Sequence, residues 1–468
     1  MRSTSETEAL FAILVQLAAP EAANAIALSV RESSDRDLCR INALDFAAKR
    51  KLDEEQTIAA LLHAARLGLF EMNWNVLCPG CGGVLETNAT LKTVSHEEYT
   101  CSLCAAGYEP TLDEMVEVTF TVSANVRSIA AHNPDTLPAP EFYRQVFWGS
   151  GVDLPDDETL AKDFEEVTLD SIELPAGERA SVSLLAPEAF LIIFDPVVHM
   201  AQFIEVKGDP TRERQTLTAI LNMKRAPTDR VTIRPGPLRI SFENRTTVRT
   251  LPSVWIAGDK LHDLLGKRKP FLTAKRLLTN QTFRDIYRTD TLDVDQRLKI
   301  TSLTFLFTDL KGSTELYDRV GDLVAYDLVN AHFRALNEIV AAEAGAVVKT
   351  IGDAVMATFP TPDRAVAAAL RMREAMRNLG SDLILKIGIH EGPCLAVMLN
   401  DRQDYFGQTV NIAARVQGLA TSSSIFATGK VVGDIGCAHL LENKGIIPLP
   451  QEHSLRGIAA RMAVFEIL

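Results

Sequence analysis

The C-terminal third of the chain has the clearest pattern of apolar and polar positions. Short apolar runs predict strands, and longer segments with apolar residues at every third or fourth position predict helices. The predicted elements are, in order, a strand at 303–308, a helix at about 314–343, strands at 347–350 and 354–359, a helix at about 363–379 and a strand at 383–390. This βαββαβ order is typical of the ferredoxin-like core. The two middle strands form a hairpin that turns at Gly352 and Asp353.

The pattern of the first 77 residues predicts a helical segment. Segment 41–70 predicts two helices with a break near Leu52, where Asp53 is placed to cap the second helix and Gln56 follows three residues later. A strand-like segment, 70–77, comes next. Two short helices followed by a strand predict a winged-helix-like segment.

Between these two regions the pattern changes twice. Residues 78–114 contain two cysteine pairs, and residues 115–260 contain alternating and short apolar runs that predict a β-rich module, a candidate sensor. A basic and then mixed connector follows at 261–298. The sequence therefore predicts a multidomain α+β protein, divided at 1–77, 78–114, 115–260, 261–298 and 299–468.

Composition narrows the class of protein. The chain has 468 residues, 47% of them hydrophobic, and a net charge of −13, which disfavours non-specific binding to nucleic acid or to an anionic membrane. The longest apolar stretch, 9–19, is too short to cross a bilayer and lacks the basic residues that precede the core of a signal peptide. We therefore expect a protein of the cytoplasm without a membrane span.

Four of the seven cysteines are arranged as two CxxC pairs, Cys78 with Cys81 and Cys101 with Cys104. Each pair offers two thiolates from one tight turn, and four thiolates make a closed tetrahedral zinc site. The spacing predicts a zinc ribbon in which the zinc is structural. The alternatives are a redox dithiol and four ordinary buried cysteines.

Two aspartates follow predicted strands. Asp309 ends the run 303–308, and Asp353 lies in the hairpin turn. Either residue alone would be read as a turn or capping residue. Together they can hold two hard cations, Mg²⁺ or Mn²⁺, and two cations can promote in-line attack at phosphorus.

The surrounding motifs are Phe-Thr-Asp-Leu-Lys-Gly-Ser-Thr around Asp309, Lys-Thr-Ile-Gly-Asp ending at Asp353, and Asp-Tyr-Phe-Gly-Gln-Thr-Val-Asn-Ile-Ala-Ala-Arg from 404 to 415. This ensemble resembles a class III nucleotidyl cyclase over roughly 300–468. The resemblance implies cyclisation of ATP or GTP, with the ribose 3′-hydroxyl attacking the α-phosphorus and pyrophosphate leaving.

The resemblance also implies residue roles. Lys349 and Asp404 would read the N1 and amino edge of adenine, which favours ATP over GTP. Asn411 and Arg415, four residues apart on one helix face, would orient the ribose and meet the transition-state charge. Further contacts to the triphosphate would come from Arg456 and from the backbone amides of Leu310, Lys311, Gly312, Ser313 and Thr314 at a helix start.

In this family the site forms between two catalytic domains, so the resemblance implies a homodimer with two equivalent sites, each with two divalent cations. The helices and zinc ribbon together resemble an uncharacterised region found in front of bacterial cyclase domains. The implied protein is an adenylate cyclase controlled by its N-terminal modules, through a ligand or protein partner that the sequence does not name.

Two other functions stay open at this point. The helical segment and zinc ribbon would suit a nucleic-acid- or protein-binding regulator with a latent cyclase domain. The second predicted helix begins with Asp53, Glu54 and Glu55, which disfavours contact with DNA. A guanylate cyclase is the third hypothesis, and Lys349 disfavours it.

Overall fold

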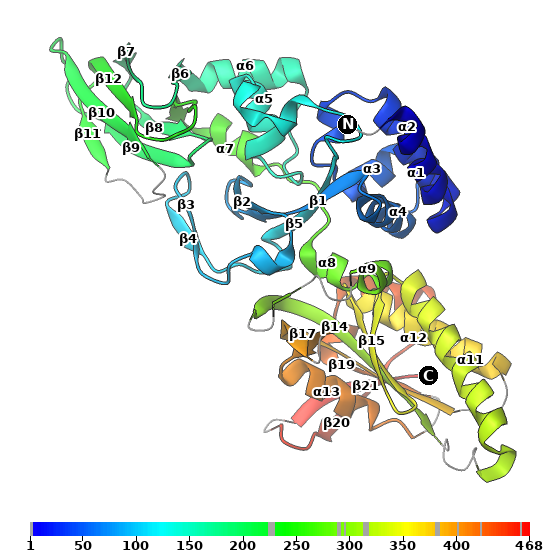
Figure 1. Cartoon of the computed structure of the whole chain (residues 1–468). Helices are drawn as coiled ribbons and strands as arrows, with labels where there is room; N and C mark the ends of the chain where they lie inside the picture. The colour runs from blue at the N-terminus through cyan, green and yellow to red at the C-terminus, as the bar shows by residue number, and fades with distance from the viewer. Residues whose placement is uncertain are drawn as a thin grey trace. The chain divides into compact units, whose positions relative to one another are not determined.

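We describe a computed structural model of the chain, covering residues 3–222, 230–287, 292–293, 296–311, 318–379, 384–399, 402–421, 424–458 and 461–468. The chain divides into two compact units (Figure 1). Unit 1 comprises Met1–Ala89, Thr93–Pro110 and Glu114–Leu272. Unit 2 comprises Thr90–Lys92, Thr111–Asp113 and Thr273–Leu468.

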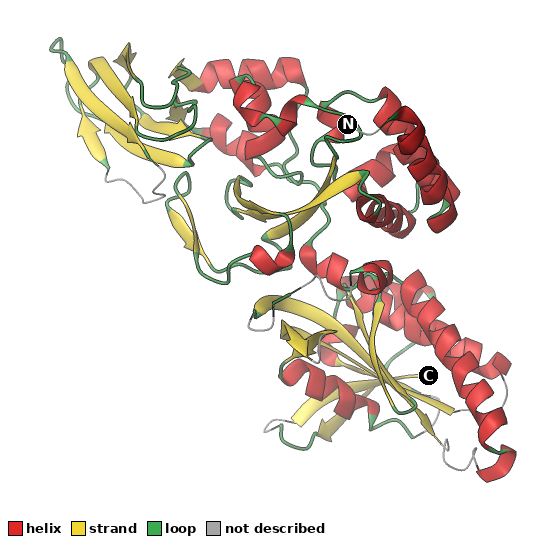
Figure 2. Ribbon diagram, viewed as in Figure 1, coloured by secondary structure: helices red, strands yellow, loops and turns green. Residues whose placement is uncertain are grey.

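Unit 1 opens with four helices that pack on one another (Figure 2). They are α1 (Thr4–Leu17), α2 (Pro20–Glu32), α3 (Ala43–Arg50) and α4 (Glu54–Arg66), with a 3₁₀ turn, η1 (Arg36–Leu38), before α3. The predicted cap of α4 is confirmed, because the Asp53 carboxylate accepts a hydrogen bond from the Gln56 amide at 2.9 Å. Apolar residues of α4 at helical spacing, among them Ile58, Leu61 and Leu62, are buried.

A three-stranded antiparallel sheet follows, in the order β2 (Val84–Asn88), β1 (Phe70–Leu77), β5 (Val116–Val122). Strand β5 begins the region 115–260 in sequence, yet it pairs with β1 along seven residues and completes this sheet. Between β2 and β5 lie η2 (Leu91–Thr93) and a short hairpin, β3 (Tyr99–Cys101) with β4 (Ala106–Tyr108).

Helical turns cover the segment after β5. They are η3 (Ala130–His132), η4 (Pro134–Thr136), α5 (Ala139–Phe142), the π-helical η5 (Tyr143–Phe147) and α6 (Asp157–Val167). The sequence pattern did not predict α6. Its cap is Asp156, whose carboxylate accepts from the Thr159 amide at 2.8 Å.

The rest of the β-rich region forms two sheets that share one apolar core, which is a sandwich arrangement. The first sheet has the order β10 (Gln215–Leu221), β12 (Gly236–Asn244), β7 (Arg179–Ala186). The second has the order β11 (Val231–Ile233), β9 (Met200–Val206), β8 (Phe190–Asp195), β13 (Ser253–Ala257), β6 (Thr168–Ser171). Helix α7 (Asp259–Gly266) follows β13.

Unit 2 contains the predicted βαββαβ order. Its elements are α8 (Ala274–Leu278), α9 (Gln281–Ile286), β14 (Leu298–Lys311), α11 (Asp322–Ala342), β15 (Ala346–Ile351), β16 (Ala354–Phe359), α12 (Pro362–Leu379) and β17 (Ile384–Leu399). The four strands lie in the order β15, β16, β14, β17, and every neighbouring pair is antiparallel. The ferredoxin-like core is thus confirmed.

Further elements extend this sheet beyond β17. They are β18 (Arg402–Phe406), α13 (Gln408–Gln417), β19 (Ile425–Thr428), α14 (Gly429–Val432), α15 (Ile435–Asn443), β20 (Leu449–Ser454) and β21 (Arg461–Ile467). Strand β19 shows how the two faces are separated: Ile425 and Ala427 join the core that includes α11 and α12, whereas Phe426 packs with α13 on the other face. Within the described part of the chain, no helix is both long and apolar enough to cross a membrane.

Candidate active site and four-cysteine centre

Strand β14 positions the first predicted carboxylate. The sequence pattern ended this strand at residue 308, but β14 continues to Lys311, and Asp309 pairs opposite Lys386 of β17. The Lys386 ammonium lies 3.6 Å from the Asp309 carboxylate, which is about one third exposed. The sequence reasoning missed Lys386, because only the register of β14 with β17 brings it to Asp309.

The β15–β16 hairpin positions the second carboxylate. Gly352 and Asp353 form its two-residue turn, and Gly352 has a φ of +64°, a conformation that glycine adopts without strain. Strand β16 lies beside β14, with Val355 opposite Thr308, so Asp309 and Asp353 belong to the same end of neighbouring strands. The register confirms that the fold brings these two segments together.

The environment of Asp353 suits a cation. Its Oδ2 atom is buried and has no hydrogen-bond partner among the described residues. A buried unpaired carboxylate oxygen is costly, and a bound divalent cation would relieve that cost. Buried His332 of α11 lies near enough to feel the charge: burial lowers the pKa of His332 to about 4, and the charge of Asp353 opposes that shift.

The predicted phosphate-binding segment is only partly described. Leu310 is buried in the core between the sheet and α11, and Lys311 is exposed and donates a hydrogen bond to the Thr421 carbonyl at 3.2 Å. Both residues lie in strand β14, not at a helix start as the sequence analysis expects. Gly312, Ser313 and Thr314 lie outside the described residues.

Lys349 and Asp404 form an ion pair. Lys349 Nζ donates a hydrogen bond to Asp404 Oδ2, and Asp404 Oδ1 accepts from the Tyr405 amide at 2.8 Å. The Asp404 side chain is 10% exposed, whereas that of Lys349 is 42% exposed. Lys349 lies only four residues before Asp353 in sequence, but it donates its hydrogen bond to Asp404.

A bulge in β15 and an arginine of α9 explain the pairing of Lys349 with Asp404. The register of β15 with β16 shifts between Val347 and Lys349, and such a bulge redirects the side chains that follow it. Arg284 of α9 donates to the carbonyls of both Val348 and Gln403, at 3.4 and 2.9 Å, and thereby ties β15 to β18. The sequence showed no sign of Arg284, which lies in the segment read as a connector.

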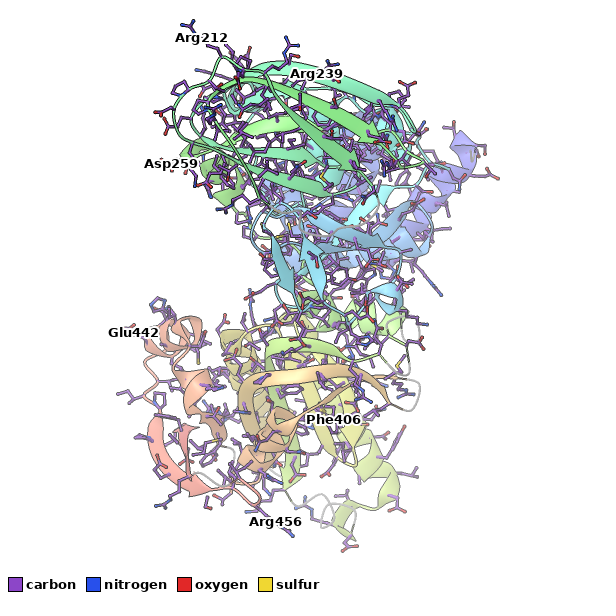
Figure 3. The ribbon with its side chains drawn as sticks, turned by 90° about the vertical axis from the view of Figure 1, so that its left-hand side faces the viewer. Arg212, Arg239, Asp259, Phe406, Glu442 and Arg456 are labelled. Carbon is purple, nitrogen blue, oxygen red and sulfur yellow. The ribbon has the colours of Figure 1, made fainter. Side chains whose placement is uncertain are left out.

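Helix α13 carries Asn411 and Arg415 one turn apart. Asn411 is exposed and Arg415 is half-buried. The Arg415 guanidinium lies against Gly457, whose φ is +74°, with two nitrogens 3.5 Å from the place that a Cβ on Gly457 would occupy. The neighbouring Arg456, labelled in Figure 3, is exposed. Arg415 and Arg456 therefore both lie near Gly457 in unit 2.

The four cysteines of the CxxC pairs converge in unit 1, and their sulfur atoms all lie within 4.8 Å of one another. The Sγ atoms of Cys78 and Cys104 are 3.5 Å apart, and those of Cys81 and Cys101 are 3.7 Å apart. Four sulfurs on 2.3 Å bonds to a tetrahedral zinc would be about 3.8 Å apart. The geometry therefore fits a tetrahedral metal and not a disulfide.

The surroundings of the sulfurs also fit a thiolate centre. The amides of Gly83 and Cys104 donate to Cys81 Sγ and Cys101 Sγ, each at 3.4 Å. His199, buried in the turn between β8 and β9, places Nε2 3.4 Å from Cys101 Sγ. Hydrogen bonds among the four thiols lower the pKa of Cys78 and Cys104 and raise the pKa of Cys81 and Cys101. The sequence reasoning missed His199, which lies 98 residues from Cys101 along the chain.

Comparison with known proteins gives a family match for each of two parts of the chain. Residues 296–454 match the family described as the adenylate and guanylate cyclase catalytic domain, so unit 2 carries a class III nucleotidyl cyclase domain. Residues 4–285, more than half of the chain, match a family of unknown function, DUF5939. The chain belongs to the DUF5939 family, with a cyclase domain following that region.

Curated relatives match over part of their length. Adenylate cyclase 2 of Rhizobium meliloti is 35% identical over 132 residues, which is 25% of this chain and 36% of the relative. An adenylate cyclase of Streptomyces griseus is 31% identical over 169 residues, 36% of this chain and 40% of the relative. An uncharacterized Mycobacterium tuberculosis protein is 33% identical over 125 residues, 27% of this chain and 32% of that protein. The chain spans about a third of the length of these relatives.

Solved structures are also similar. The adenylyl cyclase CyaB of P. aeruginosa has a TM-score of 0.34 and 20% identity, covering 37% of this chain and 96% of that one. The guanylate cyclase domain of RhGC from Catenaria anguillulae, solved with GTP, has a TM-score of 0.33 and 22% identity, covering 36% of this chain and 97% of that one.

Proposed function

We propose that the protein is an adenylate cyclase that converts ATP to 3′,5′-cyclic AMP and pyrophosphate. The observation that carries the choice of ATP is the pairing of Lys349 with Asp404. An ammonium can donate to N1 of adenine, and a carboxylate can accept from its 6-amino group. Guanine presents the opposite pattern, so this pair disfavours GTP.

Asp309 and Asp353 would hold two divalent cations, Mg²⁺ or Mn²⁺. When bound, such cations lower the pKa of the attacking hydroxyl and neutralise phosphate charge. The unpartnered Oδ2 of Asp353 supports this role. Asn411 would orient the ribose, and Arg415 and Arg456 would meet the negative charge on the phosphates, because fixed donors stabilise charge that develops in a transition state.

We further propose that two copies of unit 2 form the site as a homodimer. Asp309 and Asp353 of one copy would face Lys349, Asp404, Asn411 and Arg415 of the other. Large apolar side chains support this arrangement: Phe406, two residues past Asp404, is 65% exposed (Figure 3), and Ile351, two residues past Lys349, is 53% exposed. A dimer interface that includes Ile351 and Phe406 would bury both.

The four-cysteine centre is proposed to hold one structural Zn²⁺. All four ligand positions of a tetrahedral ion would be taken by sulfur, which leaves no position for a substrate. Its role would be to stabilise the fold of unit 1. The N-terminal modules of unit 1 would then regulate the cyclase, through a small ligand or a protein partner.

The first experiment measures cyclic nucleotide production by the full-length protein with ATP or GTP, each with Mg²⁺ or Mn²⁺. We expect cyclic AMP from ATP, and none from an Asp309→Ala variant. Cyclic GMP as the main product would overturn the choice of ATP. No product from either nucleotide would favour the hypothesis of a binding regulator with a latent cyclase domain.

Regulation is tested with a fragment that contains the cyclase domain alone. The long C-terminal segment of unit 2 begins at Thr273. The fragment should therefore begin at Thr273 and not at residue 299. If unit 1 inhibits the enzyme, the fragment is faster than the full-length protein at equal concentration. Equal or lower rates would count against inhibition.

A further inference from the structure

Unit 1 contains a cavity of about 490 Å³ that the cyclase chemistry does not use. Its lining comes from two stretches of unit 1, 33–50 and 144–154, together with Lys269. A volume of this size falls in the range of small-molecule sites, which is roughly 300–1,000 Å³.

The lining is strongly basic. Six of its side chains are cationic and two are acidic: Arg36, Arg40, Lys49, Arg50, Arg144 and Lys269 against Asp37 and Asp45. Clustered guanidinium and ammonium groups recognise phosphate and carboxylate, which accept hydrogen bonds from both nitrogens of an arginine. The positive charge available to a ligand depends on how many of these cations already pair with carboxylates.

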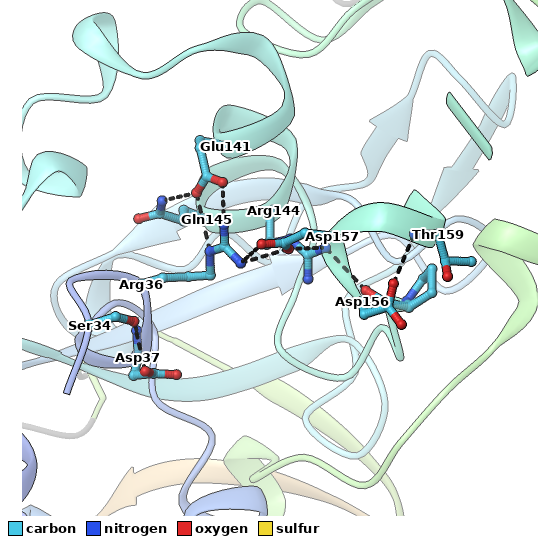
Figure 4. Close-up of polar contacts among 10 residues, drawn as sticks. Ser34, Arg36, Asp37, Glu141, Arg144, Gln145, Asp156, Asp157 and Thr159 are labelled. Atoms are coloured by element: carbon cyan, nitrogen blue, oxygen red, sulfur yellow. Dashed lines mark hydrogen bonds and ion pairs between the residues drawn. The ribbon is translucent and has the colours of Figure 1, made fainter. Parts of the chain in front are cut away.

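Two of the six cations, Arg36 and Arg144, are neutralised by carboxylates from within unit 1 (Figure 4). Arg36 forms ion pairs with Glu141 and, at 2.8 Å, with Asp157. Arg144 lies 3.1 Å from the same Asp157. These contacts hold the two guanidiniums in place and leave them little free charge.

The other four cations of the lining keep an excess of positive charge. Lys49 and Lys269 share a single carboxylate, Asp45, at 2.9 and 3.5 Å. Within the described part of the chain, neither Arg40 nor Arg50 forms an ion pair with a carboxylate. Three of the six cations therefore lack a partner of their own.

Each of the two arginines is held by neutral groups. Arg40 donates to the Val146 carbonyl and, at 3.0 Å, to the Thr87 hydroxyl. Arg50 donates to the Ser29 hydroxyl at 2.8 Å and lies 3.8 Å from the centre of the Phe46 ring. Burial lowers the pKa of Arg40, since its charge is partly removed from water, and an anion in the cavity would offset that cost.

The charge of Glu117 acts on Arg40, but these two residues form no described ion pair. Glu117 is fully buried and accepts hydrogen bonds from Ser150 and Asn75. Burial raises the pKa of Glu117, and the charge of Arg40 opposes that shift. The described hydrogen bonds of Glu117 come from Ser150 and Asn75 and not from Arg40.

Two buried polar groups in the lining also have no hydrogen-bond partner among the described residues. They are Oε1 of Gln145, a residue 8% exposed, and the indole Nε1 of Trp148, a residue 2% exposed. Orphaned buried donors and acceptors are rare in proteins and mark places where a ligand or water completes the bonding. This acceptor and this donor, in a lining rich in cations, suit a ligand that carries other polar groups in addition to its anionic group.

We propose that this cavity binds a small organic molecule bearing an oxyanion, a phosphate or a carboxylate, between Arg40, Arg50 and the lysine pair Lys49 and Lys269. The apolar faces of Phe46 and Trp148 would contact its uncharged part. This inference concerns binding to unit 1 alone, and it holds whether or not the cyclase domain is active.

The test uses the full-length protein and two probes, inorganic phosphate observed by ³¹P line width and succinate observed by saturation-transfer NMR. The cavity variant is Lys49→Met with Lys269→Met, which removes two cations and leaves Asp45 unpaired. The matched control is Lys162→Met with Lys207→Met, two lysines of unit 1 outside the lining.

We expect at least one probe to bind the wild type and the control equally, and the cavity variant to bind it at least about tenfold more weakly, since each lost charge-assisted hydrogen bond is worth roughly 1.5–3 kcal/mol. The probe that binds tells phosphate from carboxylate. Equal binding by all three proteins, or no binding of either probe to the wild type, would overturn the proposal.

Hydrogen exchange provides a measurement that does not depend on the variants folding. With saturating probe, amides of 33–50 and 144–154 in the wild-type chain should become more protected, and those of the sheet formed by β7, β10 and β12 should not change. Protection confined to unit 2 would place the bound anion at the cyclase site and contradict the proposal.

Discussion

Lys349 on β15 donates a hydrogen bond to Asp404 on β18, although three strands of the sheet, β16, β14 and β17, separate these two in strand order. The contact is possible because of the bulge at Val348 and the Arg284 bridge between the strands. The pair is thus held together before a nucleotide binds. Preorganised groups lose little entropy on binding, which would favour the base selection proposed for this pair.

The first prediction concerns this pair. Lys349→Ala and Asp404→Asn should each lower kcat/KM for ATP by about tenfold to a hundredfold, because each removes a hydrogen bond that involves a charged group. The rate with GTP should fall less, so the ratio of ATP to GTP turnover narrows. Steady-state assays with both nucleotides check this, with Lys444→Ala as an exposed control. An unchanged ratio would show that the pair does not read the base.

The second prediction concerns Asp353. Asp353→Asn should abolish cyclase activity without lowering the stability of the metal-free protein, because the variant removes a buried oxygen charge that has no described partner. Mn²⁺ at a hundredfold excess over its Kd should stabilise the wild type by about 2.7 kcal/mol and leave the variant unaffected. Thermal unfolding with and without Mn²⁺ measures both effects. Asp327→Asn, on the exposed side of α11, is the control, and it should respond to Mn²⁺ as the wild type does.

The third prediction concerns Arg415. Arg415→Ala should lower kcat by about a hundredfold to a thousandfold with a smaller effect on KM, since removing one fixed transition-state donor has that effect in other enzymes. Gly457→Val should act in the same direction but more weakly. It would introduce a side chain at φ +74° and beside the guanidinium, and so displace Arg415. A rise in KM with kcat unchanged, in either variant, would contradict the proposed role.

The fourth prediction concerns the four cysteines. The purified protein should contain one zinc per chain, and Cys101→Ser should lose it. All three tryptophans, Trp74, Trp148 and Trp255, belong to unit 1, so tryptophan fluorescence follows the unfolding of that unit. The variant should melt at a lower temperature by this probe. Metal analysis that finds no zinc in the wild type would contradict the proposed zinc site.

The fifth prediction concerns pH. His332 and His390 are buried in unit 2, and burial lowers the pKa of each to about 4. An unfolded histidine titrates near 6.5, so between pH 6.5 and 4 the unfolded chain binds more protons than the folded one. The stabilisation is complete above pH 6.5 and is lost as the pH falls. From pH 7 to 5 the free energy of unfolding of unit 2 should fall by about 2 kcal/mol for each histidine.

Calorimetry at the two pH values tests this prediction. His390→Asn can still bond to Thr428, which His390 contacts at 2.8 Å, but it no longer titrates. The variant should therefore lose less stability on acidification than the wild type. An equal loss in both proteins would assign the effect to other groups.

Much of the architecture was determined by the sequence alone. Local patterns decide local structure, so the cap of α4 at Asp53, the order of strands and helices around Asp309 and Asp353, and the gathering of four CxxC cysteines were all predictable. Each depends on residues close together in the chain or on a spacing with one chemical use. The motif around Asp309 and Asp353 was enough to indicate the cyclase class.

Other features depended on the tertiary structure, because they are contacts between residues far apart in sequence. Strand β14 extends past residue 308 since β17 offers partners up to Ile384. Lys349 contacts Asp404 and not the nearby Asp353, because a bulge and an arginine from another helix set its direction. His199 reaches Cys101 across 98 residues. The basic cavity of unit 1 likewise exists only once α3 and the segment 144–154 are folded together. Sequence periodicity records which face of an element is apolar, whereas packing decides which polar side chains meet.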